Sequence, residues 1–210
     1  MFLTIIKKIY RGQSLARVLM NLSFKDFEVS GLVVDVGGGR RPDYFSYFNT
    51  KRVSKIVPLD GSIDSIDFEK DRLNYDDNSV DTVVLCNVLE HIFNHNFLVS
   101  EIYRILKNDS ALVGFVPFMV NYHPDPNDYF RYTKDALFKI FSNSGFKDIN
   151  IKTVGSSSFY VNYNNIMLSF PKFIRPALFL PYYVLDKVFC FFRPNISERY
   201  PLGYTFYARK

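Results

Sequence analysis

The feature that most constrains the fold is a short apolar run that ends in three consecutive glycines. Residues 33–36 read as a buried strand, and Gly37, Gly38 and Gly39 follow it directly. Such a turn between a strand and a helix lets backbone amides approach a ligand closely. Positions 40–42 are Arg-Arg-Pro, so the turn is neither a G-x-G-x-x-G dinucleotide fingerprint nor a P-loop.

Strand and helix patterns alternate along the chain. Apolar, β-branched runs predict strands at 32–36, 53–59, 81–86, 111–118, 149–154 and 204–208. Helical spacing predicts helices at 42–48, 88–106 and 133–144, and the last has Thr133 as N-cap and Gly145 as C-cap. This alternation predicts an α/β, doubly wound sheet with helices on both faces.

Two segments depart from this alternation. In the first 25 residues, basic side chains without any acid accompany two helical patterns on either side of Gly12. We predict either a helical cap or a membrane-surface contact there. An insertion at about 156–201 separates the last two strands and contains the apolar stretch 166–192. The longest uncharged run within 166–192 is ten residues, whereas a spanning helix needs about 20. A lid over the substrate and an interfacial patch that reaches a lipid-linked substrate both fit.

Charge and cysteine content limit the partners and the compartment. The 210 residues carry a net charge of +5, which favours acidic partners such as phosphates, nucleic acid or anionic lipid. Only Cys86 and Cys190 are present, so neither a disulfide framework nor a cysteine metal cluster is expected. The low cysteine content predicts a cytoplasmic protein, either free in the cytoplasm or at the inner face of the membrane.

An acid follows the second predicted strand at a distance that suits a nucleoside. Asp60 lies about 20 residues beyond the glycine turn and precedes Gly61. A carboxylate there can accept both hydroxyl protons of a ribose. The turn and Asp60 together therefore predict an adenosine-type cofactor.

Four blocks of sequence, in order, resemble the class I S-adenosylmethionine-dependent methyltransferases of the type 11-like group. They are residues 35–39, Asp60, residues 67–81, and 87–92 (Asn-Val-Leu-Glu-His-Ile). The resemblance implies a helical cap over 1–30 and a methyltransferase domain over 31–210, with a Rossmann-like, seven-stranded, mostly parallel sheet whose last strand is antiparallel. It also implies S-adenosylmethionine as cofactor, held by Asp35, Gly37, Gly38, Gly39, Asp60, Gly61, Asp67, Phe68 and Asn87.

The polar segment 123–133 follows the strand predicted at 111–118. It resembles a segment common in methyltransferase-like proteins encoded with glycan-biosynthesis genes. Acceptor substrates bind at this end of the strands. His123 is the candidate general base, since imidazole takes up a proton near neutral pH. The remaining candidates are Asp128, which could orient His123, His91 as a second catalytic group or a helix cap, and Arg131, Tyr132 and Tyr129 as substrate-binding residues.

A metal site built from His123, Asp125 and Asp128 has suitable ligand types. Their spacing matches no established site, and Asp and Asn in proline-rich turns commonly satisfy backbone groups. We therefore expect no metal.

The sequence predicts methyl transfer to a hydroxyl of a sugar, glycolipid or polysaccharide intermediate, with peripheral membrane contact. A nucleic-acid or other small-molecule methyltransferase is one alternative, although nucleic acid is disfavoured because the basic residues are scattered. A non-catalytic, methyltransferase-like partner protein at the membrane is another.

Overall fold

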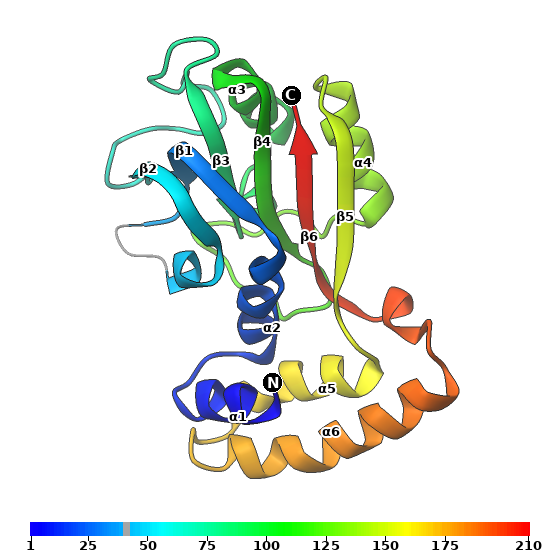
Figure 1. Ribbon diagram of the computed structural model, residues 1–210. Helices are drawn as coiled ribbons and strands as arrows, with labels where there is room; N and C mark the ends of the chain where they lie inside the picture. Colours follow the sequence, from blue (N-terminus) through cyan, green and yellow to red (C-terminus); the bar gives the residue numbers. More distant parts are fainter. Residues whose placement is uncertain (40–42) are drawn as a thin grey trace. The chain divides into compact units, whose positions relative to one another are not determined.

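A computed structural model describes residues 1–39 and 43–210, and Arg40, Arg41 and Pro42 lie outside the described residues. The elements shown in Figure 1 are α1 (Phe2–Tyr10), α2 (Leu15–Ser23), η1 (Phe24–Asp26), β1 (Glu28–Val36), η2 (Asp43–Tyr47), β2 (Asn49–Leu59), β3 (Val80–Cys86), η3 (Leu89–His91), α3 (His95–Ile105), β4 (Leu106–Pro117), α4 (Lys134–Asn143), β5 (Lys147–Gly155), α5 (Ser158–Ile166), η4 (Met167–Ser169), α6 (Arg175–Phe192), η5 (Ile196–Arg199) and β6 (Pro201–Arg209).

The chain divides into two compact units. Unit 1 comprises Met1–Ser23, Pro117–Asn121 and Thr153–Tyr204, and unit 2 comprises Phe24–Val116, Tyr122–Lys152 and Thr205–Lys210. The N-terminal helices and the insertion between the last strands, which are far apart in sequence, therefore belong to the same unit.

The described strands form one mixed sheet in the order β2-β1-β3-β4-β6-β5. β1 pairs in parallel with β2 and with β3, and β3 pairs in parallel with β4. Hydrogen bonds join Asp109 to Lys210 in unit 2 and Phe118 to Leu202 in unit 1, so β6 runs antiparallel to β4. The predicted antiparallel last strand is therefore present.

The sheet has six strands within residues 1–39 and 43–210, where the resemblance implies seven. Residues 60–79, which join β2 to β3, form turns and no ladder. This segment is rich in Asp, Ser and Asn, whose side chains bond to nearby backbone and so compete with sheet pairing. Because residues 60–79 form turns, they add no seventh strand to the sheet.

The helix predictions are confirmed with two differences. Thr133 caps α4, because its hydroxyl oxygen accepts a hydrogen bond from the Ala136 amide at 3.2 Å. The helix predicted at 88–106 is divided into η3 and α3, and its last residue belongs to β4. The segment predicted as a helix at 42–48 is the 3-10 helix η2.

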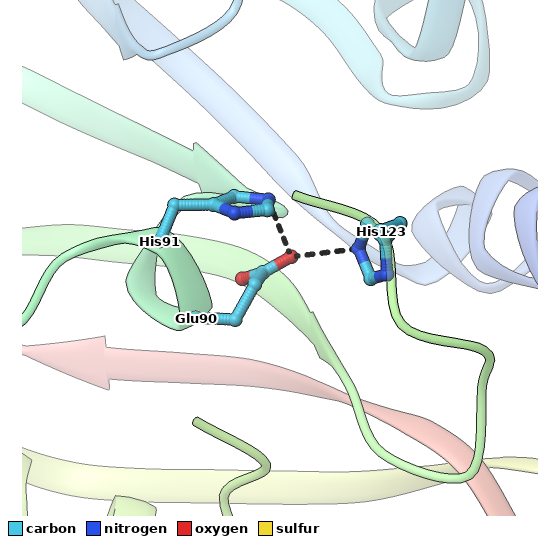
Figure 2. Close-up of side chains that lie close together, drawn as sticks. All are labelled: Glu90, His91 and His123. Atoms are coloured by element: carbon cyan, nitrogen blue, oxygen red, sulfur yellow. Dashed lines mark ion pairs between the residues drawn. The ribbon is translucent and has the colours of Figure 1, made fainter. Parts of the chain in front are cut away.

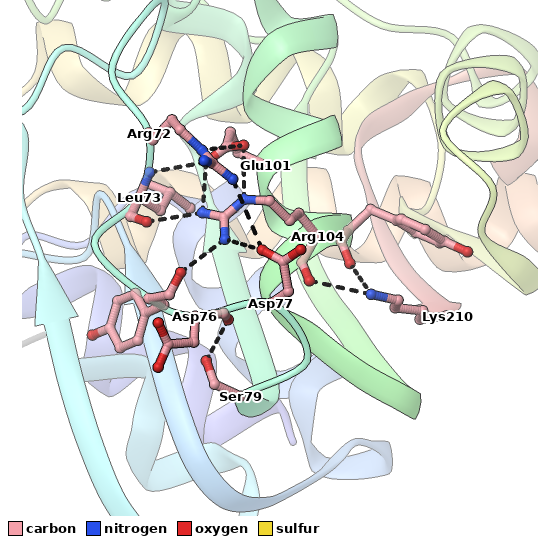
Figure 3. Close-up of polar contacts among 10 residues, drawn as sticks. Arg72, Leu73, Asp76, Asp77, Ser79, Glu101, Arg104 and Lys210 are labelled. Atoms are coloured by element: carbon pink, nitrogen blue, oxygen red, sulfur yellow. Dashed lines mark hydrogen bonds and ion pairs between the residues drawn. The ribbon is translucent and has the colours of Figure 1, made fainter.

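Arg104 on α3 fastens the turn segment before β3 to that helix (Figure 3). Its guanidinium donates hydrogen bonds to the carbonyls of Leu73 and Tyr75, at 2.9 and 2.8 Å, and to the carboxylates of Asp77 and Glu101. Hydrogen bonding to Glu101 raises the pKa of Arg104 and lowers that of Glu101. These charge-assisted bonds fix the C-terminal end of the segment that joins β2 to β3.

Unit 1 is built around the inward faces of its four α-helices. Its core contains Ile5 and Ile9 from α1, Tyr163 from α5, and Phe179 from α6, all of them fully buried. Asp186, also fully buried on α6, accepts hydrogen bonds of 2.7 Å from the hydroxyls of two serines at 156 and 157. The insertion predicted from the sequence is therefore a packed helical structure with a satisfied buried carboxylate.

We expect Phe179→Ala to lower the free energy of unfolding by about 3–5 kcal/mol, because it leaves a cavity in this core. Phe191→Ala on the same helix is the matched control: its side chain is 81% exposed, so its effect should stay within about 0.5 kcal/mol. Chemical denaturation followed by circular dichroism measures both. Equal losses in the two variants would contradict the packing described for α6.

Candidate functional site

A cavity of about 990 Å³ lies at the carboxyl ends of β1, β2 and β3 in unit 2. Because β1 pairs with both neighbours in parallel, with Val36 opposite Leu59 and Leu85, the residues that follow these strands meet at one edge. The lining residues predicted from the sequence are Gly37, Asp60, Gly61, Asp67, Phe68, Asn87 and His91.

The glycine turn has no room for side chains. Gly37 has a φ of +74°, and a Cβ placed on it would lie 2.4 Å from Cγ2 of Val88. A Cβ on Gly38 would lie 1.7 Å from a carboxylate oxygen of Asp35. Close approach of the turn to the ends of β1 and β3 therefore requires glycine.

Asp60 holds its own turn and faces the glycine turn. Its Oδ1 accepts hydrogen bonds from the amides of Ser62 and Ile63, at 3.0 and 3.1 Å, and from the Ser62 hydroxyl at 2.7 Å. Oδ2 is the atom nearest to a Cβ placed on Gly39, at 3.9 Å. Oδ1 thus stabilises the local turn, and Oδ2 lies on the side of Gly39.

Asp67 repeats this arrangement seven residues later. Its Oδ1 accepts a hydrogen bond from the Glu69 amide, and its amide donates to Asp71, as the Asp60 amide donates to Asp64. The hydrogen bond from Lys70 lowers the pKa of Asp67, so its carboxylate is ionised at neutral pH.

The cavity lining is acidic, although the chain as a whole is basic. Five carboxylates and one lysine are among its described lining residues: Asp60, Asp67, Glu69, Asp71, Asp125 and Lys70. A lining with this excess of negative charge favours a cationic ligand over a phosphate.

Three of the predicted cofactor residues are not among the described lining residues of the cavity. Asp35 is fully buried, and its two carboxylate oxygens accept hydrogen bonds of 2.6 and 2.8 Å from the Tyr44 hydroxyl. Gly38 and Gly39 are in the turn but not among the described lining residues. Asp35 therefore stabilises the base of the turn, as its proximity to Gly38 also indicates.

The loop at 123–132 is held by an internal ion pair and by η3. The Arg131 guanidinium contacts both carboxylate oxygens of Asp128, and this hydrogen bonding lowers the pKa of Asp128 to about 2. Asp128 also accepts a hydrogen bond of 2.9 Å from the His123 amide. The Tyr129 amide donates to the Glu90 carbonyl at 2.8 Å, which docks the loop on η3.

The predicted substrate-binding residues differ in accessibility. Tyr129 is exposed, and its ring lies edge-on to the exposed ring of Phe93, with centroids 5.4 Å apart. Tyr132 is buried, and its hydroxyl donates to the Leu89 carbonyl at 3.1 Å. Arg131 is engaged with Asp128. Of the three, Tyr129 is the side chain presented to solvent.

Glu90, His91 and His123 form a histidine cluster beside the cavity (Figure 2). Oε1 of Glu90 lies 3.6 Å from Nε2 of His91 and 3.8 Å from Nε2 of His123. The two imidazole rings are perpendicular, with centroids 5.4 Å apart. The structure thus brings both predicted catalytic histidines together, and Asp128 lies 3.7 Å from Nδ1 of His123.

Sequence reasoning did not select Glu90 or Phe93 as site residues. Glu90 directly precedes His91, and its position next to a histidine at the end of a strand was the available signal. Its full burial, however, follows from the docking of the loop that carries Tyr129. No sequence pattern relates Phe93 to Tyr129, because the contact joins two segments that are far apart in the sequence.

Residues 44–114 match a family described as "Methyltransferase domain". An uncharacterized protein of Methanocaldococcus jannaschii is 29% identical over 188 residues, which cover 81% of this chain and 70% of that protein. The matched domain includes Asp60, Asp67 and the first two members of the histidine cluster, and ends before His123.

Solved structures of methyltransferases have the same fold. Phosphoethanolamine N-methyltransferase 2 of Haemonchus contortus, in complex with S-adenosylmethionine, superposes with a TM-score of 0.55 at 16% identity, over 91% of this chain and 51% of that chain. The chain therefore spans about half the length of that enzyme. An S-adenosylmethionine-dependent methyltransferase of Mesorhizobium loti matches over 96% of this chain and all of its own, with a TM-score of 0.57 at 13% identity. Residues 44–114 thus match a methyltransferase domain, and the chain shares its fold with solved structures of S-adenosylmethionine-dependent methyltransferases.

We expect Asp60→Ala to weaken binding of S-adenosylmethionine by about 1–3 kcal/mol, because a charge-assisted hydrogen bond is lost. Asp60→Asn is the matched control for the turn: it keeps an Oδ1 acceptor for Ser62 and Ile63 but replaces the ionised Oδ2 by an amide NH2 group, so it should also weaken binding. Calorimetric titration measures both affinities. Wild-type affinity in both variants would remove Asp60 from the cofactor site.

Proposed function

We propose that the protein is a methyltransferase that transfers the methyl group of S-adenosylmethionine to a hydroxyl of a sugar-containing or glycolipid acceptor. The methyl carbon moves from the sulfonium sulfur to the acceptor oxygen. The C–S bond breaks with its electron pair left on sulfur, a C–O bond forms, and the hydroxyl proton passes to a base. Protein groups accelerate this step by aligning the two reactants and removing the proton.

The acidic cavity supports the cofactor part of the proposal. S-adenosylmethionine carries a sulfonium charge, which the carboxylates of Asp60 and Asp67 favour electrostatically. The glycine turn offers backbone amides without side chains at the end of β1, where the amino-acid portion of the cofactor fits. In this arrangement Asp60 Oδ2 is the acceptor for the ribose hydroxyls.

The histidine cluster is the single observation that carries the reaction type. An amine attacks through a lone pair that it already exposes, whereas a hydroxyl must lose its proton as it attacks. A group of proton acceptors at the cavity edge therefore suits an oxygen nucleophile. His91 lines the cavity, and the His123 side chain is 43% exposed, so both are accessible to an acceptor.

An exposed aromatic pair supports a sugar acceptor. Tyr129 and Phe93 present ring surface next to the loop that carries His123. Apolar ring faces of this kind can cover the C–H face of a sugar, while polar groups of the loop meet its hydroxyls. The acidic lining and this aromatic pair favour a sugar over a nucleic-acid backbone, whose phosphates the carboxylates would repel.

The distribution of charge supports a lipid-linked acceptor at an anionic membrane surface. Unit 1 contains nine Lys and Arg residues and two Asp and Glu residues, so its net charge is +7. Because the whole chain carries +5, the net charge of unit 2 is −2. Exposed apolar side chains on α6 form a stripe that includes Leu180, Val184, Val188 and Phe191. Exposed apolar residues flanked by Lys and Arg are typical of interfacial helices. No helix within the described residues is long and apolar enough to cross a bilayer.

We expect His123→Ala to leave binding of S-adenosylmethionine intact and to lower turnover about 10²–10⁴-fold, since the group that handles the acceptor proton is removed. The assay incubates the protein with methyl-labelled cofactor and with lipid-linked and free sugar fractions, and mass spectrometry identifies the product. Tyr122→Ala, at the exposed neighbouring position, is the control and should retain activity. Label found only in nucleic acid or protein would contradict the proposed acceptor.

We expect the intact chain to sediment with vesicles of phosphatidylglycerol and phosphatidylcholine but not with phosphatidylcholine alone. Replacing Phe191 and Phe192 by serine should weaken this binding about tenfold or more, because two exposed aromatic rings no longer enter the interface. Phe138→Ser, at an exposed position of α4, is the matched control. Equal sedimentation of the double variant and the wild type would count against contact through α6.

A further inference from the structure

We propose that the histidine cluster is a binding site for a divalent transition-metal cation, with Oε1 of Glu90 and the Nε2 atoms of His91 and His123 as ligands. The metal's role in the reaction rests on the proposed methyl transfer, whereas its binding does not. The three ligand atoms come from η3 and from the loop after β4, and they lie within 4.8 Å of one another.

The distances fit a cation placed between the three side chains. Metal–ligand bonds of about 2.1 Å in a tetrahedral arrangement separate the ligand atoms by roughly 3.4 Å. Glu90 Oε1 lies 3.6 Å from one imidazole nitrogen and 3.8 Å from the other. These two separations are too long for hydrogen bonds and exceed the tetrahedral value by a few tenths of an ångström, and the ligand atoms of the two histidines lie within 4.8 Å of each other.

The protonation of His91 is set by its surroundings. Nδ1 of His91 lies 2.5 Å from the carbonyl oxygen of Asn127, which can only accept a hydrogen bond, so Nδ1 carries the proton. The lone pair of the neutral ring is then on Nε2, the atom that faces Glu90. Metal-ligating histidines are commonly oriented in this way, by donation from the other ring nitrogen to a backbone carbonyl.

The burial of the Glu90 carboxylate is a second, independent observation that supports a cation site. Its side chain is completely buried, and among the described residues neither carboxylate oxygen has a hydrogen-bond partner. Burial of a carboxylate without compensating hydrogen bonds is strongly unfavourable. A cation bound between Oε1 of Glu90 and the two imidazole nitrogens would give this buried carboxylate the partner that its hydrogen bonds do not supply.

The second imidazole is supported by the ion pair of the loop. Nδ1 of His123 lies 3.7 Å from Oδ2 of Asp128 and 3.4 Å from Arg131 Nη2. The Asp128 carboxylate also fixes the backbone of His123 through the amide hydrogen bond. Asp128 and Arg131 thus act as positioning residues for the ring and leave its Nε2 directed at Glu90.

The ligand set selects the class of metal. Two imidazoles and one carboxylate suit Zn²⁺, Mn²⁺, Fe²⁺ or Co²⁺, whereas Mg²⁺ and Ca²⁺ prefer oxygen ligands. Three protein ligands leave at least one coordination position open. A cation there would lower the pKa of a bound acceptor hydroxyl, so that the hydroxyl proton would pass to solvent water and the metal would stabilise the resulting oxyanion, with His123 serving as a ligand.

Direct metal binding tests the proposal without an acceptor substrate. The full chain is freed of metal with a chelator and titrated with Co²⁺, whose absorption bands report nitrogen and oxygen coordination, and with Zn²⁺ by calorimetry. We expect one ion per chain and a Co²⁺-dependent rise in melting temperature, because the cation binds only the folded protein. Glu90→Gln and His123→Ala should each lower the affinity at least about 100-fold and abolish the thermal shift.

Two features of the experiment separate metal binding from loss of folding and from other ligand sets. Glu90→Gln should be at least as stable as the metal-free wild type, since it removes an uncompensated buried charge. Asp125→Asn, which alters an exposed acid next to the cavity, should keep full affinity. The proposal is overturned if Co²⁺ and Zn²⁺ do not bind the wild type or bind Glu90→Gln equally well. Methyl transfer that persists after chelation would then leave the proposed function standing, with His123 as a free base.

Discussion

Parallel pairing of β1 with both β2 and β3 is the constraint on which the cavity depends. The register places Val36 opposite Leu59 and Leu85, so the glycine turn, Asp60 and Asn87 begin at the same edge. Glycine is needed at the turn because Val88 and Asp35 already occupy the space that side chains would take. We expect the carboxylates that line the cavity at this edge to determine which cofactor binds.

A second constraint is the docking of the loop after β4 on η3. Amides of the loop donate to the Glu90 carbonyl, and the carbonyl of Asn127 accepts from His91. These bonds cover Glu90 and remove its carboxylate from water. The same contacts thus leave the Glu90 carboxylate buried and without a hydrogen-bond partner among the described residues.

The two units carry net charges of opposite sign, which the total charge of +5 does not reveal. Unit 2 combines an acidic cavity with a slightly negative net charge, and unit 1 carries the excess of Lys and Arg together with the exposed apolar stripe of α6. A basic sequence therefore does not imply a basic active site. The acidic site and the basic unit can serve different ligands, a sulfonium cofactor and an anionic surface.

The sequence by itself determined the α/β alternation, the glycine turn, Asp60 and the capped helix after Thr133, because strand and helix periods and short turns are local properties of the chain. It also predicted His91 and His123, but not that they share Glu90. The residue patterns predicted six strands, which the sheet has within the described residues, whereas the count of seven came from the resemblance and is not confirmed. The cofactor role of Asp35, which the resemblance implied, stays a prediction, and the structure adds that its buried carboxylate contacts the Tyr44 hydroxyl. Contacts between segments far apart in sequence decided these points, since burial and partner geometry arise only when the segments pack.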